Sequence, residues 1–377
     1  LEIYKLEQEL EELKKLIARL TAIVESKKLQ MEVVKEELKE LKKQYKSERK
    51  SSLVFDVSDI KVEKFDDARP VEKCVLLYTA ADEIKVVSEK NFNMSDKALG
   101  ERATLSDVFK LQLKTSTEKI VYSFTNFGNC YKIDFEDVVV GKLKDKGMPY
   151  KKLCPDALDG EKPIAFYEVG EKLPKGSLLF YSRLGYVKKS DWKEYNILKY
   201  AFQACKVNEG DELIGMETDD PEPTTTLFFV TEQGMCLNAY KNDIPTQGRV
   251  SAGVRGIALS EGDKVVYAGQ IDDEGEIIVA TDGNTYKKVI ASQIDPIPRY
   301  PKGVKLADLG KGRKVIYADY VTMPYKIAVT MDDGSLVTAD TEDDITIEDR
   351  TTKGKNIKLK KGCKATGFFS MKYLSDK

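Results

Sequence analysis

Histidine is absent from this chain of 377 residues, and cysteine and tryptophan are scarce, with six Cys and one Trp. The lack of histidine removes the commonest general base, the Ser-His-Asp and Cys-His arrangements, and the usual imidazole metal sites. The six cysteines lie far apart and include no CxxC pair, so they predict neither a disulfide scaffold nor a zinc site. We expect reduced, mostly buried cysteines, no bound metal and a cytoplasmic protein.

Long apolar runs are missing as well. No run reaches the roughly 18–20 residues that span a membrane, and no secretory signal follows the first residue, Leu1. A first residue other than Met suggests a piece of a longer protein. We expect no contact with a membrane.

The chain also lacks an excess of positive charge. Its formal net charge is −2, with 61 Lys and Arg against 63 Asp and Glu. Residues 1–50 hold 13 basic and 11 acidic residues, which leaves the remainder of the chain net acidic. A nucleic-acid-binding domain is usually basic. Any contact with nucleic acid must therefore come from a local stripe of basic residues.

Residues 1–50 carry the periodicity of a helix. Apolar residues recur at alternating steps of four and three, the seam of a coiled coil, at Leu6, Leu10, Leu13, Ile17, Leu20 and Val24, and again at Met31, Val34, Leu38, Leu41 and Tyr45. The two stretches are in phase, so one long helix and two helices joined near Glu25-Ser26 are both compatible with the pattern. Between Leu16 and Val34 the apolar face widens, which indicates burial against more than one partner helix. An ordinary coiled-coil spacer is the alternative.

Residues 51–72 are predicted to be a linker, because they are rich in Lys, Ser and Asp and contain Arg69-Pro70. Residues 73–372 repeat a different pattern six times. Each copy has a β-branched or aromatic run, a hydroxyl residue, a turn and a second strand that often carries Lys. The copies are residues 74–87, 120–133, 178–189, 227–237, 277–288 and 327–337, and their hydroxyl residues are Thr79, Thr125, Ser182, Thr231, Thr281 and Thr330.

A period of about 50 residues built from strands is typical of radial repetition. Turn glycines such as Gly185 and Gly234 follow five of the hydroxyl residues, and closing glycines stand at Gly210, Gly262, Gly312 and Gly362. The sequence therefore predicts a mainly β fold: a six-bladed, propeller-like β-pinwheel preceded by an antiparallel α-helical coiled-coil segment. WD40 and kelch repeats are excluded, because the Trp-Asp and Gly-Gly signatures are absent.

The fourth repeat carries a family signature. Gly253-Val-Arg255-Gly256-Ile-Ala-Leu259 followed by Gly262-Asp263-Lys-Val-Val resembles the blade ending of the C-terminal domain in the A subunits of bacterial type IIA DNA topoisomerases, gyrase and topoisomerase IV. The stretch from Gly147 to Phe166 resembles the family's bridge between blades two and three. Helical arm, linker and blades also come in the family's order.

The resemblance implies a dimer gate at the tip of the helical arm and a basic rim that holds and bends duplex DNA. The gate residues would be Leu16, Leu20, Ile23, Val24, Leu29, Met31, Val33 and Val34. The rim residues would lie on the second strand of each blade or in the following loop: Lys85, Lys132, Lys188, Lys189, Arg249, Arg255, Lys287, Lys288, Lys302, Lys305, Lys353, Lys355 and Lys358. Such a rim neutralises phosphates and responds to DNA shape more than to base sequence.

The resemblance also implies what this chain should lack. The family's nucleophilic tyrosine follows an arginine in a winged-helix domain; the one Arg-Tyr pair here, Arg299-Tyr300, lies in a loop of the fifth repeat and is interpreted as a coincidence. Acidic groups such as Asp219-Asp220, Asp272-Asp273 and residues 342–344 are interpreted as solvated turns. We expect no catalysis and no cofactor in this region; ATP and magnesium would serve the rest of the enzyme, whose B subunit is the ATPase.

Gyrase carries a Q-R-R-G-G-[KR]-G box after its first blade. The corresponding residues here, Asn91 to Arg102, contain no such box, which favours a topoisomerase IV-like protein that binds DNA modestly and associates with the nucleoid. The competing hypothesis is a protein-binding scaffold made of a coiled coil and a propeller. A propeller hydrolase is a third candidate, although no carboxylate pair or histidine marks a site.

Overall fold

Two helices form the first part of the chain. The computed structural model describes residues 2–46, 71–100, 102–135, 138–170 and 173–372, and the chain divides into two compact units, Leu1–Arg69 and Pro70–Lys377. In the first unit α1 (Glu2–Glu25) and α2 (Lys27–Gln44) meet at Ser26. Ser26 is extended and its hydroxyl accepts the backbone N–H of Leu29, an N-cap that starts α2 as a separate helix. Of the two arrangements that periodicity allowed, the chain therefore adopts two helices.

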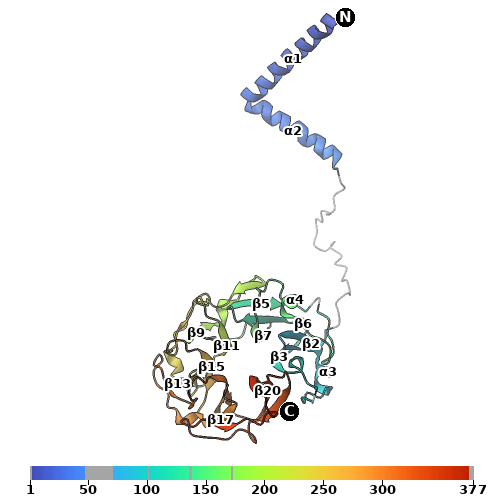
Figure 1. Cartoon of the computed structure of the whole chain (residues 1–377). Helices are drawn as coiled ribbons and strands as arrows, with labels where there is room; N and C mark the ends of the chain where they lie inside the picture. The colour runs from blue at the N-terminus through green and yellow to red at the C-terminus, as the bar shows by residue number, and fades with distance from the viewer. Residues whose placement is uncertain (1, 47–70, 101, 136–137, 171–172, 373–377) are drawn as a thin grey trace, which may run out of the picture. The chain divides into compact units, whose positions relative to one another are not determined.

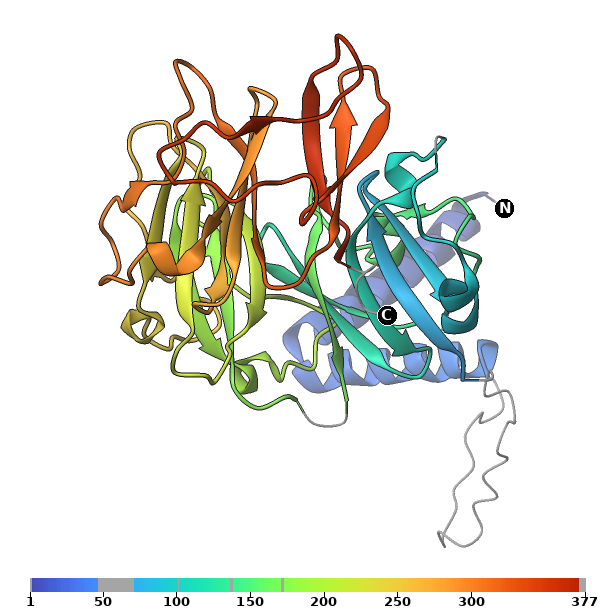
Figure 2. The same ribbon diagram turned by 90° about the horizontal axis from the view of Figure 1, so that it is seen from below.

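Six small sheets form the second unit, and seen face-on they are arranged around a ring (Figure 1). We number the blades 1 to 6 along the chain. In the view turned by 90° the strands run through the thickness of the ring (Figure 2). Each blade is built on an antiparallel hairpin: β1 (Lys73–Thr79) with β2 (Glu83–Ser88), β4 (Ile120–Thr125) with β5 (Asn129–Ile133), β8 (Ser177–Ser182) with β9 (Tyr186–Asp191), β12 (Thr226–Thr231) with β13 (Met235–Ala239), β16 (Glu276–Thr281) with β17 (Thr285–Ile290), and β20 (Lys326–Met331) with β21 (Leu336–Asp340). These are the six predicted repeats, so the predicted fold class is confirmed.

An inner strand pairs with the first strand of each hairpin. The inner strands are β3 (Phe109–Ser116), β7 (Pro163–Val169), β11 (Leu213–Thr218), β15 (Val265–Ile271), β19 (Val315–Val321) and β23 (Ala365–Ser370). A β-bulge interrupts each of these pairings near the hydroxyl residue that marks the repeat. In blade 6 the bulge follows Thr330, so Met331, and not Thr330 as the sequence suggested, occupies the position of Thr281.

An outer strand completes five of the blades, and it comes from a distant part of the chain. These strands are β6 (Met148–Pro149), β10 (Ala201–Gln203), β14 (Val254–Arg255), β18 (Val304–Lys305) and β22 (Lys355–Asn356). Each one follows the hairpin of the next blade along the chain, so neighbouring blades exchange strands. The stretch from Gly147 to Phe166 therefore does not bridge blades two and three: it supplies the outer strand of blade 1 and then enters the inner strand of blade 2.

Short helices occupy the connections between strands. They are α3 (Glu89–Met94), α4 (Tyr150–Leu153) and the 3-10 helices η2 (Leu105–Asp107), η3 (Trp192–Tyr195), η4 (Lys241–Asp243) and η5 (Ala291–Gln293). None of the helices in the described residues is long and apolar enough to cross a membrane.

The hydrophobic core lies between the blades. Phe180 and Phe124 pack between blades 2 and 3, and comparable clusters fill the next junctions around the ring. The junction of blades 6 and 1 is poorer, with Val108, Ala328 and Met371 as its buried members. All six cysteines are free thiols and five of them are buried, as predicted. Burial raises the pKa of Cys236 to about 12, which keeps that thiol unreactive.

Candidate nucleic-acid interface

Lysines on the second strands of the hairpins are the first group of predicted rim residues. Lys85, Lys188 and Lys287 occupy one position of the repeat, opposite Leu77, Phe180 and Val279. All three are buried, and Lys188 and Lys287 are each only 1% exposed. Blades 2, 4 and 6 have Tyr131, Leu237 and Val337 at this position. The position thus faces the core, where lysine alternates with apolar residues around the ring.

The ammonium groups of these lysines bind backbone carbonyls. Lys287 Nζ donates to the carbonyls of Asp349, Arg350 and Thr352 at 2.8, 3.0 and 2.9 Å. These bonds hold the turn that precedes outer strand β22. Because the site is desolvated, burial lowers the pKa of Lys287 to about 8.

Lys188 and Lys85 act in the same way with fewer partners. Lys188 Nζ donates to the carbonyl of Ala204 at 2.8 Å and to that of Arg249. Burial lowers its pKa to about 8 as well. Lys85 Nζ donates to the carbonyl of Leu143 at 3.2 Å. None of these three ammonium groups can reach a phosphate without leaving its carbonyl partners.

The next residue of the second strand is also committed to contacts within the protein. Lys189 pairs with Asp219 at 2.6 Å and Lys288 with Glu276 at 2.8 Å. Lys132 donates to the carbonyl of Ile197 and lies over the ring of Tyr122. Successive residues of a strand point to opposite faces, and each second strand has a neighbouring blade on both faces. The second strands therefore bury or pair their lysines.

A second group of predicted residues lies on or beside the outer strands. Arg255 is on β14, Lys305 on β18 and Lys355 on β22. With Lys302, Lys353 and Lys358 they form a group that we call the outer arc, and all six are exposed. Strand exchange places the members from repeats four, five and six on blades 3, 4 and 5.

The charges of the outer arc are only partly used within the protein. Lys305 pairs with Asp308 at 3.1 Å and Lys358 with Asp344 at 2.9 Å, both at the surface. The guanidinium of Arg255 lies over the ring of Tyr186 at 5.4 Å. The ammonium groups of Lys302, Lys353 and Lys355 form no hydrogen bond or ion pair within the described part of the chain. These three ammonium groups are available to an anion.

Arginine side chains link successive outer strands through hydrogen bonds to backbone carbonyls. Two of these arginines were not among the predicted rim residues. Arg299 Nη1 donates to the carbonyl of Arg255, and Arg350 Nη1 donates to that of Lys305, both at 3.1 Å. Arg249 makes the equivalent bond to the carbonyl of Gln203. A guanidinium has five donors, so each arginine keeps donors that face solvent. Their spacing of 50 and 51 residues is the signal that could have identified them.

The predicted coincidence of Arg299 and Tyr300 now has a structural explanation. Besides the bond to Arg255, the Arg299 side chain donates through Nε to the carbonyl of Asp243, a bond that has no catalytic character. Tyr300 has a positive φ of 87° and lies under the guanidinium of Arg255. Both residues therefore belong to the contacts that link successive outer strands.

Positive charge increases along the segments that contain the outer strands. Residues 196–212 hold two basic and three acidic residues, and residues 248–264 hold three and two. Residues 298–314 hold six and one, and residues 349–365 hold seven and one. The acidic total of the chain therefore conceals a basic surface on the outer strands of blades 4 and 5.

The residues that correspond to the gyrase box begin in α3 and continue toward η2. Lys97 lies over the ring of Phe92 at 4.5 Å, and Asp96 caps its own turn by accepting the N–H of Ala98. The stretch contributes few basic residues at the junction of blades 6 and 1.

The predicted dimer-gate residues lie on α1 and α2. Ile23 and Val33 are half-buried, and the other six are exposed within one chain, with Leu20 at 52% and Val24 at 74%. These helices therefore present an apolar face that a single chain leaves uncovered.

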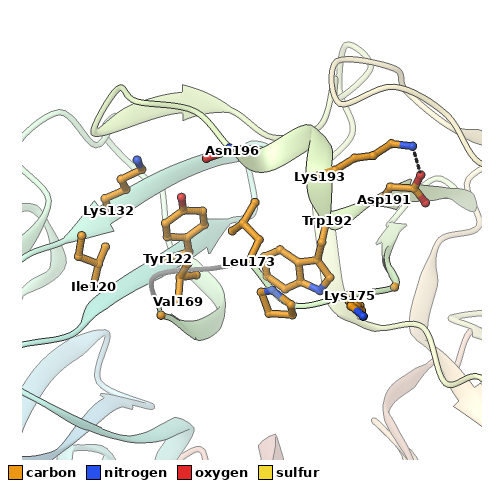
Figure 3. Close-up of a pocket in the computed structure, with 13 residues that line it drawn as sticks. Ile120, Tyr122, Lys132, Val169, Leu173, Lys175, Asp191, Trp192, Lys193 and Asn196 are labelled. Atoms are coloured by element: carbon orange, nitrogen blue, oxygen red, sulfur yellow. Dashed lines mark ion pairs between the residues drawn. The ribbon is translucent and has the colours of Figure 1, made fainter.

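A cavity of about 680 Å³ opens at the ends of the strands of blades 2 and 3. Leu173 lies between Tyr122 and Trp192 in its wall, and Lys193 pairs with Asp191 at its margin (Figure 3). Asp191 is the single carboxylate among its described lining residues. The described lining of the cavity thus offers no acid pair for hydrolysis. In the described residues, no group of three or more Cys, Asp or Glu could hold a metal ion.

The second unit is a ring of blades in which each outer strand comes from the repeat that follows along the chain. This arrangement is a β-pinwheel, which defines the class of this protein. The family model "DNA gyrase C-terminal domain, beta-propeller" matches residues 225–272 and 275–322. Over these residues the chain is similar to the C-terminal β-pinwheel domain in the A subunits of type IIA DNA topoisomerases.

Relatives of both kinds in this family are similar to the chain. It is 27% identical to the A subunit of DNA topoisomerase 4 from Staphylococcus epidermidis over 309 residues, which cover 81% of this chain and 38% of the relative. It is 25% identical to the A subunit of DNA gyrase from Chlamydia pneumoniae over 372 residues, 96% of this chain and 44% of the relative. The chain thus spans less than half the length of these relatives.

Solved structures share the fold. The C-terminal domain of DNA topoisomerase IV matches with a TM-score of 0.69 and 22% identity, over 80% of this chain and 93% of that one. The C-terminal domain of DNA gyrase A matches with a TM-score of 0.57 and 16% identity, over 79% and 99%.

Proposed function

We propose that the β-pinwheel binds duplex DNA through the outer arc, holding and bending it for strand passage by a type IIA topoisomerase. The observation that carries this proposal is the exposed basic surface on the outer strands of blades 3 to 5, in a domain that is acidic overall. Lysines there neutralise phosphates and release counterions, so affinity depends on salt and little on base sequence. Arg249, Arg299 and Arg350 add donors along the same edge. The second-strand lysines serve this surface indirectly, because they hold the turns that precede outer strands.

The test is a titration of the chain against a labelled random-sequence duplex, followed by fluorescence anisotropy from about 50 to 200 mM salt. We expect binding that weakens linearly in a double-logarithmic plot. The triple variant Lys302→Gln, Lys353→Gln, Lys355→Gln should make that slope shallower by about 2–3, since each phosphate contact contributes about 0.9.

A matched triple variant controls for the loss of charge. Lys90 in α3, Lys175 before β8 and Lys326 at the start of β20 are exposed lysines that do not lie on outer strands. Their replacement by Gln should leave the slope nearly unchanged. Equal effects of the two triple variants would show that net charge, and not the outer arc, governs binding.

The competing proposal is a protein-binding scaffold, which the acidic total charge favours. The same titration separates the two functions. A complete lack of duplex binding at low salt would exclude the DNA-binding function and leave the scaffold.

Within the family, we propose a protein closer to topoisomerase IV than to a supercoiling gyrase. The support is the stretch after β2, which lacks the box and has few basic residues. The full-length protein, assembled with the ATPase of the enzyme (its B subunit) in the presence of ATP and magnesium, should decatenate linked circles better than it introduces supercoils. Efficient negative supercoiling would contradict this assignment.

We also propose that α1 and α2 form part of a homodimer interface, an antiparallel coiled-coil gate through which the transported segment leaves. The uncovered apolar faces of both helices support it. Sedimentation should show a concentration-dependent dimer, which Leu16→Ser with Leu20→Ser weakens and the control Gln8→Ser does not. A monomer at every concentration would contradict a gate formed by these helices alone.

A further inference from the structure

Blade 6 differs from the other blades at its outer edge. The other five sheets have four strands each, whereas the sheet β21-β20-β23 has three in the described residues. In each of the five complete blades, one residue of the second strand forms a backbone hydrogen bond with the outer segment. It lies seven positions after the hydroxyl residue that marks the repeat. The bonds join Val86 with Gly141, Lys132 with Tyr200, Lys189 with Gln247, Asn238 with Ile297, and Lys288 with Thr346 and Glu348. Thr338 occupies this position in blade 6, and within the described residues its outward backbone groups have no such partner.

The turn of the blade 6 hairpin shows the same difference. In blades 2, 3 and 4 the carbonyl of the turn glycine accepts an N–H from the outer segment: Gly128 from Ala204, Gly185 from Gly256 and Gly234 from Leu306, at 2.7–2.8 Å. In each of these blades the outer segment also contacts the glycine itself, so that a Cβ there would meet it. Among the described residues, a Cβ on Gly334 would meet nothing within 4 Å. The described part of the chain thus leaves open at Gly334 the place that an outer strand fills in the other blades.

A cavity lies along this edge. It measures about 680 Å³ and is lined by Thr338 and Asp340 from β21 and by Phe92 and Leu99 from the segment after β2. Asp332 and Asp333 precede β21, and Glu342 and Asp343 follow it, all exposed. These exposed carboxylates form an acidic surface at the open edge, and the hollow beside it has a mixed lining of apolar residues and charged residues of both signs.

The outer strands of blades 3, 4 and 5 define what fits such an edge. Each begins with a glycine of positive φ, Gly253, Gly303 or Gly354, on which a Cβ would stand 2.6 Å or less from a second-strand carbonyl oxygen. An extended dipeptide containing Arg255, Lys305 or Lys355 follows. The segments of blades 4 and 5 then bury an aliphatic side chain, Leu306 or Ile357, whereas blade 3 has Gly256 at this position and buries Ile257 one residue later.

We propose that the edge of β21 binds an extended segment of another protein, with the pattern glycine, two residues that include a lysine or arginine, and then leucine or isoleucine. The segment pairs antiparallel to the start of β21. Its glycine lies against the carbonyl of Leu336, its aliphatic residue donates its N–H to the carbonyl of Gly334, and its basic residue faces the acidic surface. Strand addition to a sheet edge derives affinity from main-chain bonds and specificity from the alternate side chains. This surface is separate from the outer arc and does not depend on DNA binding.

The experiment uses a labelled peptide copied from this chain, residues 302–308 (Lys-Gly-Val-Lys-Leu-Ala-Asp), titrated with the whole chain by fluorescence anisotropy. We expect saturable binding. N-methylation at the leucine that copies Leu306 should weaken it at least about tenfold by removing the N–H. The peptide with Gly303→Ala should lose as much affinity, because the added Cβ would meet the carbonyl of Leu336. A scrambled peptide of the same charge controls for attraction to the acidic surface.

The protein side carries a matched pair of variants. Leu336→Pro removes the N–H at the position where Cys236 pairs with Val304 in blade 4, and Leu336→Val keeps it, so only the proline variant should lose the peptide. Thermal melts check that both fold, and the modified peptides remain decisive if the proline variant does not. The proposal is overturned if the unmodified peptide does not bind. The peptide would also fail to bind if another part of this chain already occupied the edge, and that result overturns the proposal in the same way. Binding that tolerates both the N-methyl group and the alanine overturns it as well.

Discussion

Lysines on the second strands and lysines on the outer strands recur with the same period but have opposite surroundings. Lys188 and Lys287 are 1% exposed and surrounded by carbonyls, whereas Lys302, Lys353 and Lys355 are exposed to solvent. The difference follows from topology. A second strand lies between neighbouring blades, while an outer strand has the sheet on one side and water on the other. Recurrence of a basic residue therefore indicates a shared position in the blade and does not by itself indicate a shared binding surface.

The largest effect should come from a buried lysine. Lys287→Met removes a buried, charged donor shared by three partly buried carbonyls, which should lower the free energy of unfolding by about 2–4 kcal/mol. Urea denaturation measures it. The control Lys302→Met loses the same charge at an exposed position and should change the free energy of unfolding by less than about 0.5 kcal/mol. Equal stability of the two variants would show that the buried second-strand lysines and the exposed outer-strand lysines contribute alike to folding.

The next effect tests the gradient of charge around the ring. Lys353→Gln with Lys355→Gln should weaken duplex binding about tenfold, or about 1.4 kcal/mol, at moderate salt. Lys199 and Lys206 are exposed in the segment of blade 2 that holds more acids than bases, and their replacement by Gln should weaken binding less than about twofold. Anisotropy titrations compare the pairs. A larger loss from the blade 2 pair would place the DNA on the other side of the ring.

A smaller effect is expected where the buried lysine has one partner. Lys85→Met breaks the single bond to Leu143, so the free energy of unfolding should fall by about 1 kcal/mol. Urea denaturation beside Lys287→Met gives the comparison. A loss as large as that of Lys287→Met would show that burial of the charge, and not the number of carbonyl partners, determines the cost.

The last effect concerns pH. The pKa of Lys287 is lowered from 10.5 to about 8 in the folded protein, so below pH 8 both states hold the proton and this group adds no pH dependence. Between about pH 8 and 10.5 the unfolded state holds more protons, and stability should rise with pH by less than about 1 kcal/mol per unit. Lys287→Met should lack this rise in denaturation curves measured at pH 8 and 10. An identical pH profile in the variant would contradict the lowered pKa.

The fold was predictable where its signals are local. Recurring β-branched or aromatic runs, hydroxyl residues and turns identified all six hairpins, and helical periodicity identified the helical start without deciding between one helix and two. The outer strands were not predictable, because pairs such as Val254-Arg255 are too short to carry a period and find their partners in another blade. For the same reason the sequence analysis did not find the links made by Arg299 and Arg350. The repeat that contains Lys302, Lys305 or Lys353 also did not indicate the blade on which each lysine lies.

The amino-acid sequence by itself determined the number of blades, the hairpins, the helical start and the family resemblance, since each depends on residues close together in the chain. The tertiary structure alone decided which basic residues face water. That outcome depends on strand exchange, which brings a segment from one repeat onto the edge of the blade before it and covers the second strands from both sides. Exposure is a property of neighbours in space, and here those neighbours lie about 50 residues apart in sequence.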